Sequence, residues 1–204
     1  MTGTPSSVSN TSLKVMNAAL AQLGVDEIDS FSDSSLAAKT GNKLYSDIVE
    51  HELSAYPWRF ARERITLTRV DQTAPKPWTG LYRLPASALV LHTVYVDDYI
   101  GDFDRFGANV AVNVDSNSTS TVSAEITENV SANNWPGYFR RSLIMSLAAA
   151  IAMPITQDDQ MAMALQKESE IMIAKARSRD AQGRTPSRLD TKLFIKARRT
   201  HRNI

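Results

Sequence analysis

Three histidines are the first residues to consider for chemistry, because histidine is the commonest general acid or base near neutral pH. His51 falls near the end of a predicted helix, His92 in a predicted strand and His201 in the C-terminal tail. None stands in a partner pattern such as H-E-x-x-H, which would place a metal ligand or base on one helical face. We therefore expect structural or solvated histidines and no catalytic one.

An acidic group follows the strongest predicted strand, at Asp97, Asp98, Asp102 and Asp104. Carboxylates at this spacing could bind a cation, but the glycine and glutamate positions of an EF-hand loop are missing. We interpret the group as a solvated turn. There is no cysteine, P-loop, G-x-G-x-x-G or G-x-S-x-G. A glycosidase-type carboxylate pair would meet only in space, and no residue points to one. The sequence thus predicts no enzyme and no catalytic, metal-binding or cofactor-binding residue.

The C-terminal region carries the most informative charges. Residues 175–204 hold ten Lys or Arg and two Asp or Glu, whereas residues 1–174 hold thirteen and twenty, within an overall net charge of +1. One hypothesis is an arm that orders on docking to an acidic protein, and others are nucleic-acid binding or a solvated tail. Aromatic residues are scarce here, which disfavours single-strand binding. The candidate docking residues are Arg184, Arg188, Lys192, Leu193, Phe194, Ile195, Arg198 and Arg199.

Two helices are predicted in the first sixty residues. The first covers about residues 12–23, where apolar residues recur every three or four positions before Gly24. The second begins after a cap at Asp33 or Ser34 and ends before Pro57. Trp58 and Phe60 follow at once, and we interpret this aromatic pair as an anchor for the helix end.

The stretch from Trp135 to Arg179 predicts two antiparallel helices joined at Pro154, which should end the first helix. Thr156, followed by an aspartate three residues later, should cap the second. The stripe predicted for the first helix is Phe139, Leu143, Leu147, Ala150 and Pro154. The second contains four consecutive apolar residues, 171–174, which predicts burial on more than one side. Ile171, Met172 and Ile173 are therefore candidates for either the chain's own core or a subunit interface.

Between these helical pairs the apolar period changes from 3.6 to 2, which indicates strands with short antiparallel connections. The predicted fold class is α+β, an antiparallel bundle of about four helices with an inserted β-rich subdomain. The expected divisions are a flexible N-terminus (1–10), the bundle (11–60 and 134–180), the β-rich subdomain (61–133) and a basic C-terminal arm (181–204). No apolar run reaches the roughly 18 residues of a membrane span, so we expect no membrane partner.

The order of several short motifs resembles the head-to-tail adaptor family of short-tailed bacteriophages, also called tail tubular protein A. The resemblance covers about residues 11–180. Its motifs are Leu20-Ala-Gln-Leu-Gly24, Tyr56-Pro-Trp-Arg-Phe-Ala61, Tyr82-Arg-Leu-Pro85, Trp135-Pro136 and Ala152-Met-Pro-Ile-Thr156. Trp58, Phe60, Leu84, Pro85 and Trp135 match as fold anchors with no catalytic role.

The resemblance implies a structural virion protein without a cofactor, located in the neck or tail and assembled in the host cytoplasm. Family members form a dodecameric ring between the portal and the tail nozzle and extend the channel through which DNA is ejected, without binding it specifically. The implied partners are further copies of the chain, the portal protein, the nozzle protein and, as a further candidate, the tail fibre. A long C-terminal arm would reach the portal. The alternative hypothesis is a nucleic-acid-binding accessory protein that uses the same arm.

Overall fold

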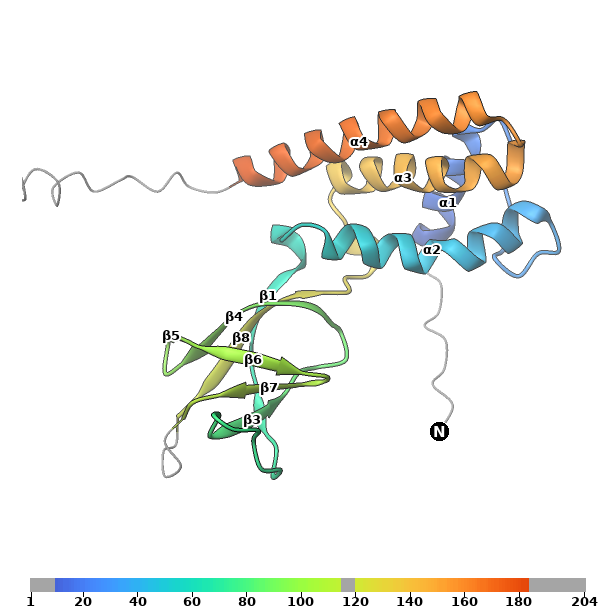
Figure 1. The fold of residues 1–204 in the computed structure, drawn as a ribbon. Helices are drawn as coiled ribbons and strands as arrows, with labels where there is room; N and C mark the ends of the chain where they lie inside the picture. The colour runs from blue at the N-terminus through green and yellow to red at the C-terminus, as the bar shows by residue number, and fades with distance from the viewer. Residues whose placement is uncertain (1–9, 115–119, 184–204) are drawn as a thin grey trace, which may run out of the picture.

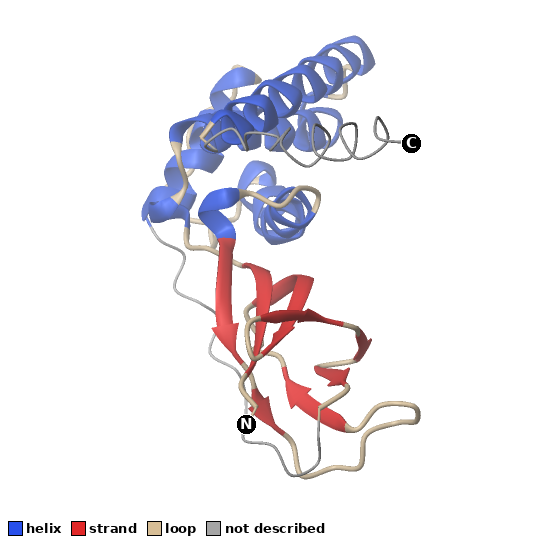
Figure 2. Cartoon of the chain, turned by 90° about the vertical axis from the view of Figure 1, so that its left-hand side faces the viewer, coloured by secondary structure: helices blue, strands red, loops and turns tan. Residues whose placement is uncertain are grey.

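The computed structural model describes residues 10–114 and 120–183 and has the predicted α+β class. Four helices gather at one end of the molecule and eight short strands at the other (Figures 1 and 2). The strands lie between the second and third helices in the sequence, as an insertion into the helical part. The helical core is therefore made from two segments that are far apart along the chain.

The first two helices begin and end on local signals. α1 (Asn10–Gln22) is followed by Gly24 at a φ of 68°, a left-handed conformation that costs glycine little. α2 (Leu36–Ser54) begins slightly later than predicted, because Ser35 is the residue whose hydroxyl accepts the Ala38 N–H at 3.1 Å. The carboxylate of Asp33 accepts N–H groups of the preceding turn instead. The predicted cap was thus wrong by one or two residues.

The third and fourth helices form the predicted antiparallel pair, but two details differ. α3 (Gly137–Thr156) continues through Pro154, so the prediction that this proline ends the helix was wrong. Pro154 lies in the last turn, and the carbonyl that it leaves without a partner belongs to Ala150, which is exposed to water. α4 (Asp159–Gln182) is capped by Asp158, whose carboxylate accepts two N–H groups, at 2.9 and 3.0 Å.

Thr156 therefore does not cap α4. Its hydroxyl donates backwards to the Ala152 carbonyl at 2.9 Å and so belongs to the end of α3. Gln157, in the left-handed region with a φ of 53°, ends α3 and turns the chain. A threonine near a helix end can bond to either side of the turn, and here Asp158 takes the capping position.

The eight strands form two antiparallel four-stranded sheets. The first has the order β1 (Arg62–Thr66), β8 (Val122–Glu128), β4 (Ala88–Val96), β5 (Tyr99–Gly101). The second has the order β2 (Thr68–Arg69), β3 (Gly80–Arg83), β7 (Asn109–Val112), β6 (Phe103–Phe106). Only Leu67 separates β1 from β2, and only Asp102 separates β5 from β6. Both edges of one sheet therefore run directly into edges of the other.

The inner faces of the two sheets enclose a small apolar core. Val94, Val110, Val112, Ala124 and Ile126 are fully buried in it. The Leu67 N–H donates to the Val122 carbonyl at 2.8 Å, which fixes the segment that passes between the sheets. The β-rich part thus has its own core, distinct from that of the helices.

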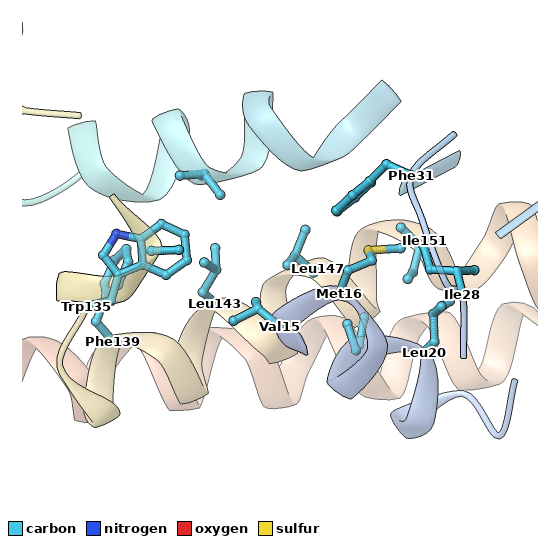
Figure 3. Close-up of a cluster of buried hydrophobic side chains, with 14 of the residues drawn as sticks. Val15, Met16, Leu20, Ile28, Phe31, Trp135, Phe139, Leu143, Leu147 and Ile151 are labelled. Carbon is cyan, nitrogen blue, oxygen red and sulfur yellow. The ribbon is translucent and has the colours of Figure 1, made fainter. Parts of the chain in front are cut away.

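The larger core lies between the helices. α1 and α2 both pack on α3, and α4 packs along α3 (Figure 3). Gly41 is a close-packing site, because a Cβ atom there would lie 2.5 Å from the Met16 Cε. The predicted stripe of α3 holds through Leu147 and then continues in Ile151, four residues on, while Ala150 and Pro154 are exposed. The prediction that Ala150 follows Leu147 in the buried stripe was therefore wrong.

Candidate functional site

The junction between helices and strands is built on aromatic rings. Trp58 is fully buried, and its ring centroid lies 5.0 Å from that of Phe139 and 6.0 Å from that of Phe60. The Trp58 Nε1–H donates to the Glu52 carbonyl at 2.7 Å. Trp135 reaches the same ring of Phe139 at 5.5 Å. Three residues predicted as fold anchors therefore meet around one phenylalanine of α3.

The other two predicted anchors lie elsewhere. Leu84 is buried in the core between the sheets, and Pro85 is half-buried directly after it. The five residues thus belong to two different cores, and the structure does not bring them together in one site.

A buried carboxylate fastens the end of α4 to this junction. Asp180 is 3% exposed, accepts the Tyr138 hydroxyl at 2.6 Å and accepts the Arg59 N–H at 3.2 Å. Arg59 begins a 3₁₀ turn (Arg59–Ala61) that leads into β1. Burial, and then the hydrogen bond to Asp180, raise the pKa of Tyr138 above its ordinary value. Sequence reasoning missed this contact, which joins residues 121 positions apart.

A pocket of about 570 Å³ opens beside Asp180, between the end of α4 and the start of the first sheet. Its charged lining residues are Arg59, Arg62, Glu125 and Asp180. Arg62 forms an ion pair with Glu125, and Asp180 is held by its two donors. Each carboxylate in the pocket is therefore already partnered, which does not favour general acid–base catalysis there.

A second buried carboxylate, Glu52, ties three helices together. It is 7% exposed and accepts the Ser146 hydroxyl at 3.0 Å, and the Ser146 and Ser169 hydroxyls lie 3.2 Å apart. These residues come from α2, α3 and α4. Sequence reasoning also missed this cluster. The available signal was the position of Glu52 next to Leu53 and three residues after Val49, on the buried side of the helix.

Two of the three histidines lie within the described residues, His92 on β4 and His51 on α2. The His92 Nε2 lies 2.7 Å from the Thr127 hydroxyl, and His51 is exposed. Burial, followed by the charge of Arg62, lowers the pKa of His92, while Glu125 acts in the opposite direction. His201 lies outside the described residues. Within residues 10–114 and 120–183, no group of three or more potential ligands could hold a metal ion.

The acidic turn is a two-residue connection between β4 and β5. Asp97 and Asp98 both have positive φ angles, 48° and 68°, as a type I′ turn requires at its central positions. The Asp97 carboxylate accepts the Thr121 N–H at 2.9 Å, and hydrogen bonds from Ser120 and Thr121 lower its pKa. Asp98 forms an ion pair with Arg64 at 2.5 Å.

α4 leaves apolar side chains uncovered. Met163 is 74% exposed and Ile171 is 47% exposed, whereas Met172 and Ile173 are half-buried. The buried residues of this helix are Ser169, Ala176 and Asp180. The prediction that residues 171–174 are buried on more than one side was therefore wrong within the described chain. Met163 and Ile171 are eight residues apart and so lie on the same broad side of the helix, with the exposed Lys167 between them.

The remaining candidates lie in residues 184–204, outside the described residues, and the predicted start of the arm at residue 181 is instead the end of α4. α3 is long and apolar enough for a membrane span by length and composition, but half of the qualifying stretch is buried in the bundle. A core helix passes the same test.

In comparisons with known proteins, no family model and no curated protein matches the chain.

Proposed function

We propose that this protein is a structural head–tail connector subunit of a tailed bacteriophage that forms a ring between the portal and the tail nozzle. The observation that carries the proposal is that two apolar side chains of α4, Met163 and Ile171, are exposed on the same broad side of the helix. A closed ring needs two different complementary faces on each subunit, and an exposed apolar helix face is suited to be one of them. The order of motifs described above supplies the particular class of assembly.

The division of charge is compatible with this role. The part of the chain before residue 175 has twenty acidic and thirteen basic residues, and a channel wall with a net negative charge repels DNA phosphates. Such a wall allows a duplex to slide without adhering. The basic arm, which begins just after α4, would dock on an acidic surface of the portal.

Ring formation is tested by charging the α4 face. Ile171→Glu combined with Met163→Glu should abolish rings when the purified protein is mixed with portal and viewed by electron microscopy, because burying an unpaired carboxylate in an apolar interface is unfavourable. The matched control is Gln166→Glu, which adds a carboxylate at an exposed position of the same helix that points away from Ile171. Normal rings from the double variant would exclude this face as the interface.

The arm is tested by deletion of residues 184–204. The truncated protein should remain folded and should fail to join portal-containing heads in a sedimentation assay. If it joins them as the full chain does, portal docking does not use the arm.

The second candidate function is an accessory protein that binds nucleic acid through the same arm, favoured by its cluster of arginines and lysines. It predicts an affinity for duplex DNA that falls steeply with added salt and disappears with the deletion. A full-length chain without measurable DNA affinity at low salt would rule it out.

A further inference from the structure

The connection between β4 and β5 holds two apolar side chains out in solvent. Tyr99 is 80% exposed and Ile100 is 76% exposed, more than any other large apolar side chain of the described residues. Consecutive side chains of a strand point to opposite faces. Exposure of both therefore means that neither face of the edge strand β5 is covered at this hairpin tip, residues 97–102, although β5 is paired with β4.

The hairpin tip is held in place from its own base. Arg64 forms the ion pair with Asp98, and its guanidinium lies 4.0 Å from the centroid of the Tyr95 ring. On the other side, Asp97 and Thr121 exchange two hydrogen bonds, at 2.9 and 3.0 Å. The tip thus presents one exposed apolar side chain on each face of a preorganised edge strand, which lowers the ordering cost of a segment that docks on it.

The charge around the tip favours a basic occupant. Residues 97–106 contain four aspartates and one arginine, a net charge of −3. Asp98 already faces Arg64, whereas Asp102 and Asp104 are exposed and follow Ile100 by two and four residues. A segment that alternates apolar and basic residues complements this surface.

Such a segment follows α4 in the same chain. Residues 184–204 contain seven Lys or Arg and one Asp, and the consecutive apolar residues Leu193, Phe194 and Ile195 lie near their middle. The ten residues from Gly183 to Leu193 can span about 33–36 Å when extended. The arm is therefore long enough to place its apolar residues well away from the end of α4.

A continuous surface leads from the end of α4 to the hairpin tip. Arg62 lines the pocket beside Asp180 and bonds to Glu125, whose other oxygen lies 3.4 Å from the Tyr95 hydroxyl. Tyr95 in turn packs under Arg64, the partner of Asp98. Figure 1 shows the end of α4 and β5 on the same side of the molecule. From Arg62 to Arg64 the strand advances only about 7 Å, well within the reach of the arm.

We infer that, before any partner binds, residues 184–204 dock on the hairpin tip of their own chain. Leu193, Phe194 and Ile195 cover Tyr99 and Ile100, and the surrounding arginines face Asp102 and Asp104. The arm is then held in a contact within its own chain that a partner must displace. The apparent affinity of the arm for that partner is its intrinsic affinity multiplied by the fraction of chains whose arm is free. This inference depends on the chain alone and not on the proposed ring.

The experiment replaces Phe194 with the photocrosslinker benzoylphenylalanine in the full-length chain. Equal amounts of light and ¹⁵N-labelled protein are mixed at low concentration, irradiated and mapped by mass spectrometry. We expect crosslinks within one chain to residues 95–105. Tyr99→Ser combined with Ile100→Ser should lower their yield at least about fivefold, because the burial of two large apolar side chains is lost. High salt should lower the yield as well.

Met163→Ser is the matched control, since it removes an equally exposed apolar side chain far from the hairpin, and it should leave the yield unchanged. Both variants change only exposed side chains, and circular dichroism checks that they fold. Crosslinks that join light and heavy chains would assign the tip to a second copy and overturn the inference. The inference would also be overturned if no crosslinks to the tip were found, or if the double variant at Tyr99 and Ile100 gave the same crosslink yield as the unmodified chain.

Discussion

Trp58 lies where the helical part of the molecule meets the strands. Its indole both packs as an aromatic ring and donates a hydrogen bond. The ring packs on Phe139 and its neighbours, and the N–H satisfies a carbonyl at the end of α2. The spacing of Trp58 and Phe60 directly after Pro57 was enough to predict an anchor. The identity of the residue on which they pack, 79 positions or more away, could not be read from the spacing.

Trp58→Phe should lower the free energy of unfolding by about 1–3 kcal/mol, because it removes a buried donor, leaves its acceptor unpaired and creates a small void. Trp78→Phe, at a half-buried loop position, is the control and should have a smaller effect. Urea denaturation followed by circular dichroism measures both. Equal losses in the two variants would contradict a special role for Trp58.

His92 makes stability depend on pH near neutrality. Its pKa is lower in the folded protein than in the unfolded chain, so the unfolded chain binds the proton more tightly. The stabilisation is fully present above the unfolded pKa of about 6.5 and is lost as pH falls from there through the folded pKa.

His92→Gln should therefore reduce the loss of stability between pH 7 and pH 5.5. His51→Gln, which replaces an exposed histidine, is the control for the loss of a histidine as such. Thermal melts in a series of buffers compare the three proteins. An unchanged pH dependence in His92→Gln would show that other groups cause it.

At the scale of elements, the sequence was most informative where a signal acts locally. The apolar run at residues 89–96 predicted a strand that ends at the two aspartates, and Ser35, Gly24 and Pro57 mark helix ends within two residues of the predicted ones. The signals failed where two residues compete for one role. Thr156 and Asp158 can both cap α4, and Pro154 is tolerated because its turn is exposed.

The β4–β5 turn gives a test at this scale. Asp98→Ala and Asp98→Gly both remove the carboxylate and its ion pair with Arg64, but alanine at a φ of 68° is strained and glycine is not. We expect Asp98→Ala to be less stable than Asp98→Gly by about 1 kcal/mol, measured by urea denaturation. If the two variants are equally stable, the turn adopts another conformation in solution.

At the scale of the whole molecule, the sequence predicted the α+β class and the insertion of strands between helical pairs, because the apolar period changes twice along the chain. It could not predict that the strands divide into two sheets sharing continuous edges, since that depends on which strands pair. It also could not predict that α4 leaves Met163 and Ile171 uncovered, because helical periodicity does not say how many neighbours a helix has.

The contacts at the end of α4 set a boundary for truncation. Ending the chain after Gly183 should change the midpoint of thermal unfolding little, because the described cores use residues up to Ala176 and the last described tertiary hydrogen bond belongs to Asp180. Ending it after Lys175 removes both residues and should cost about 2–4 kcal/mol. Differential scanning calorimetry compares the two proteins, and similar midpoints would mean that the Asp180 contacts add no stability.

The inserted position of the strands has a consequence for synthesis on the ribosome. The inner core between the sheets is complete once residue 128 has emerged, whereas α1 and α2 have little to pack on until α3 and α4 follow. At about 5–20 residues per second, that delay lasts roughly 3–11 s. During this interval α1 and α2, which are synthesised first, expose their apolar faces beside a β-rich part that is already folded. The first segments made are among the last to fold, which makes them the natural target of a chaperone.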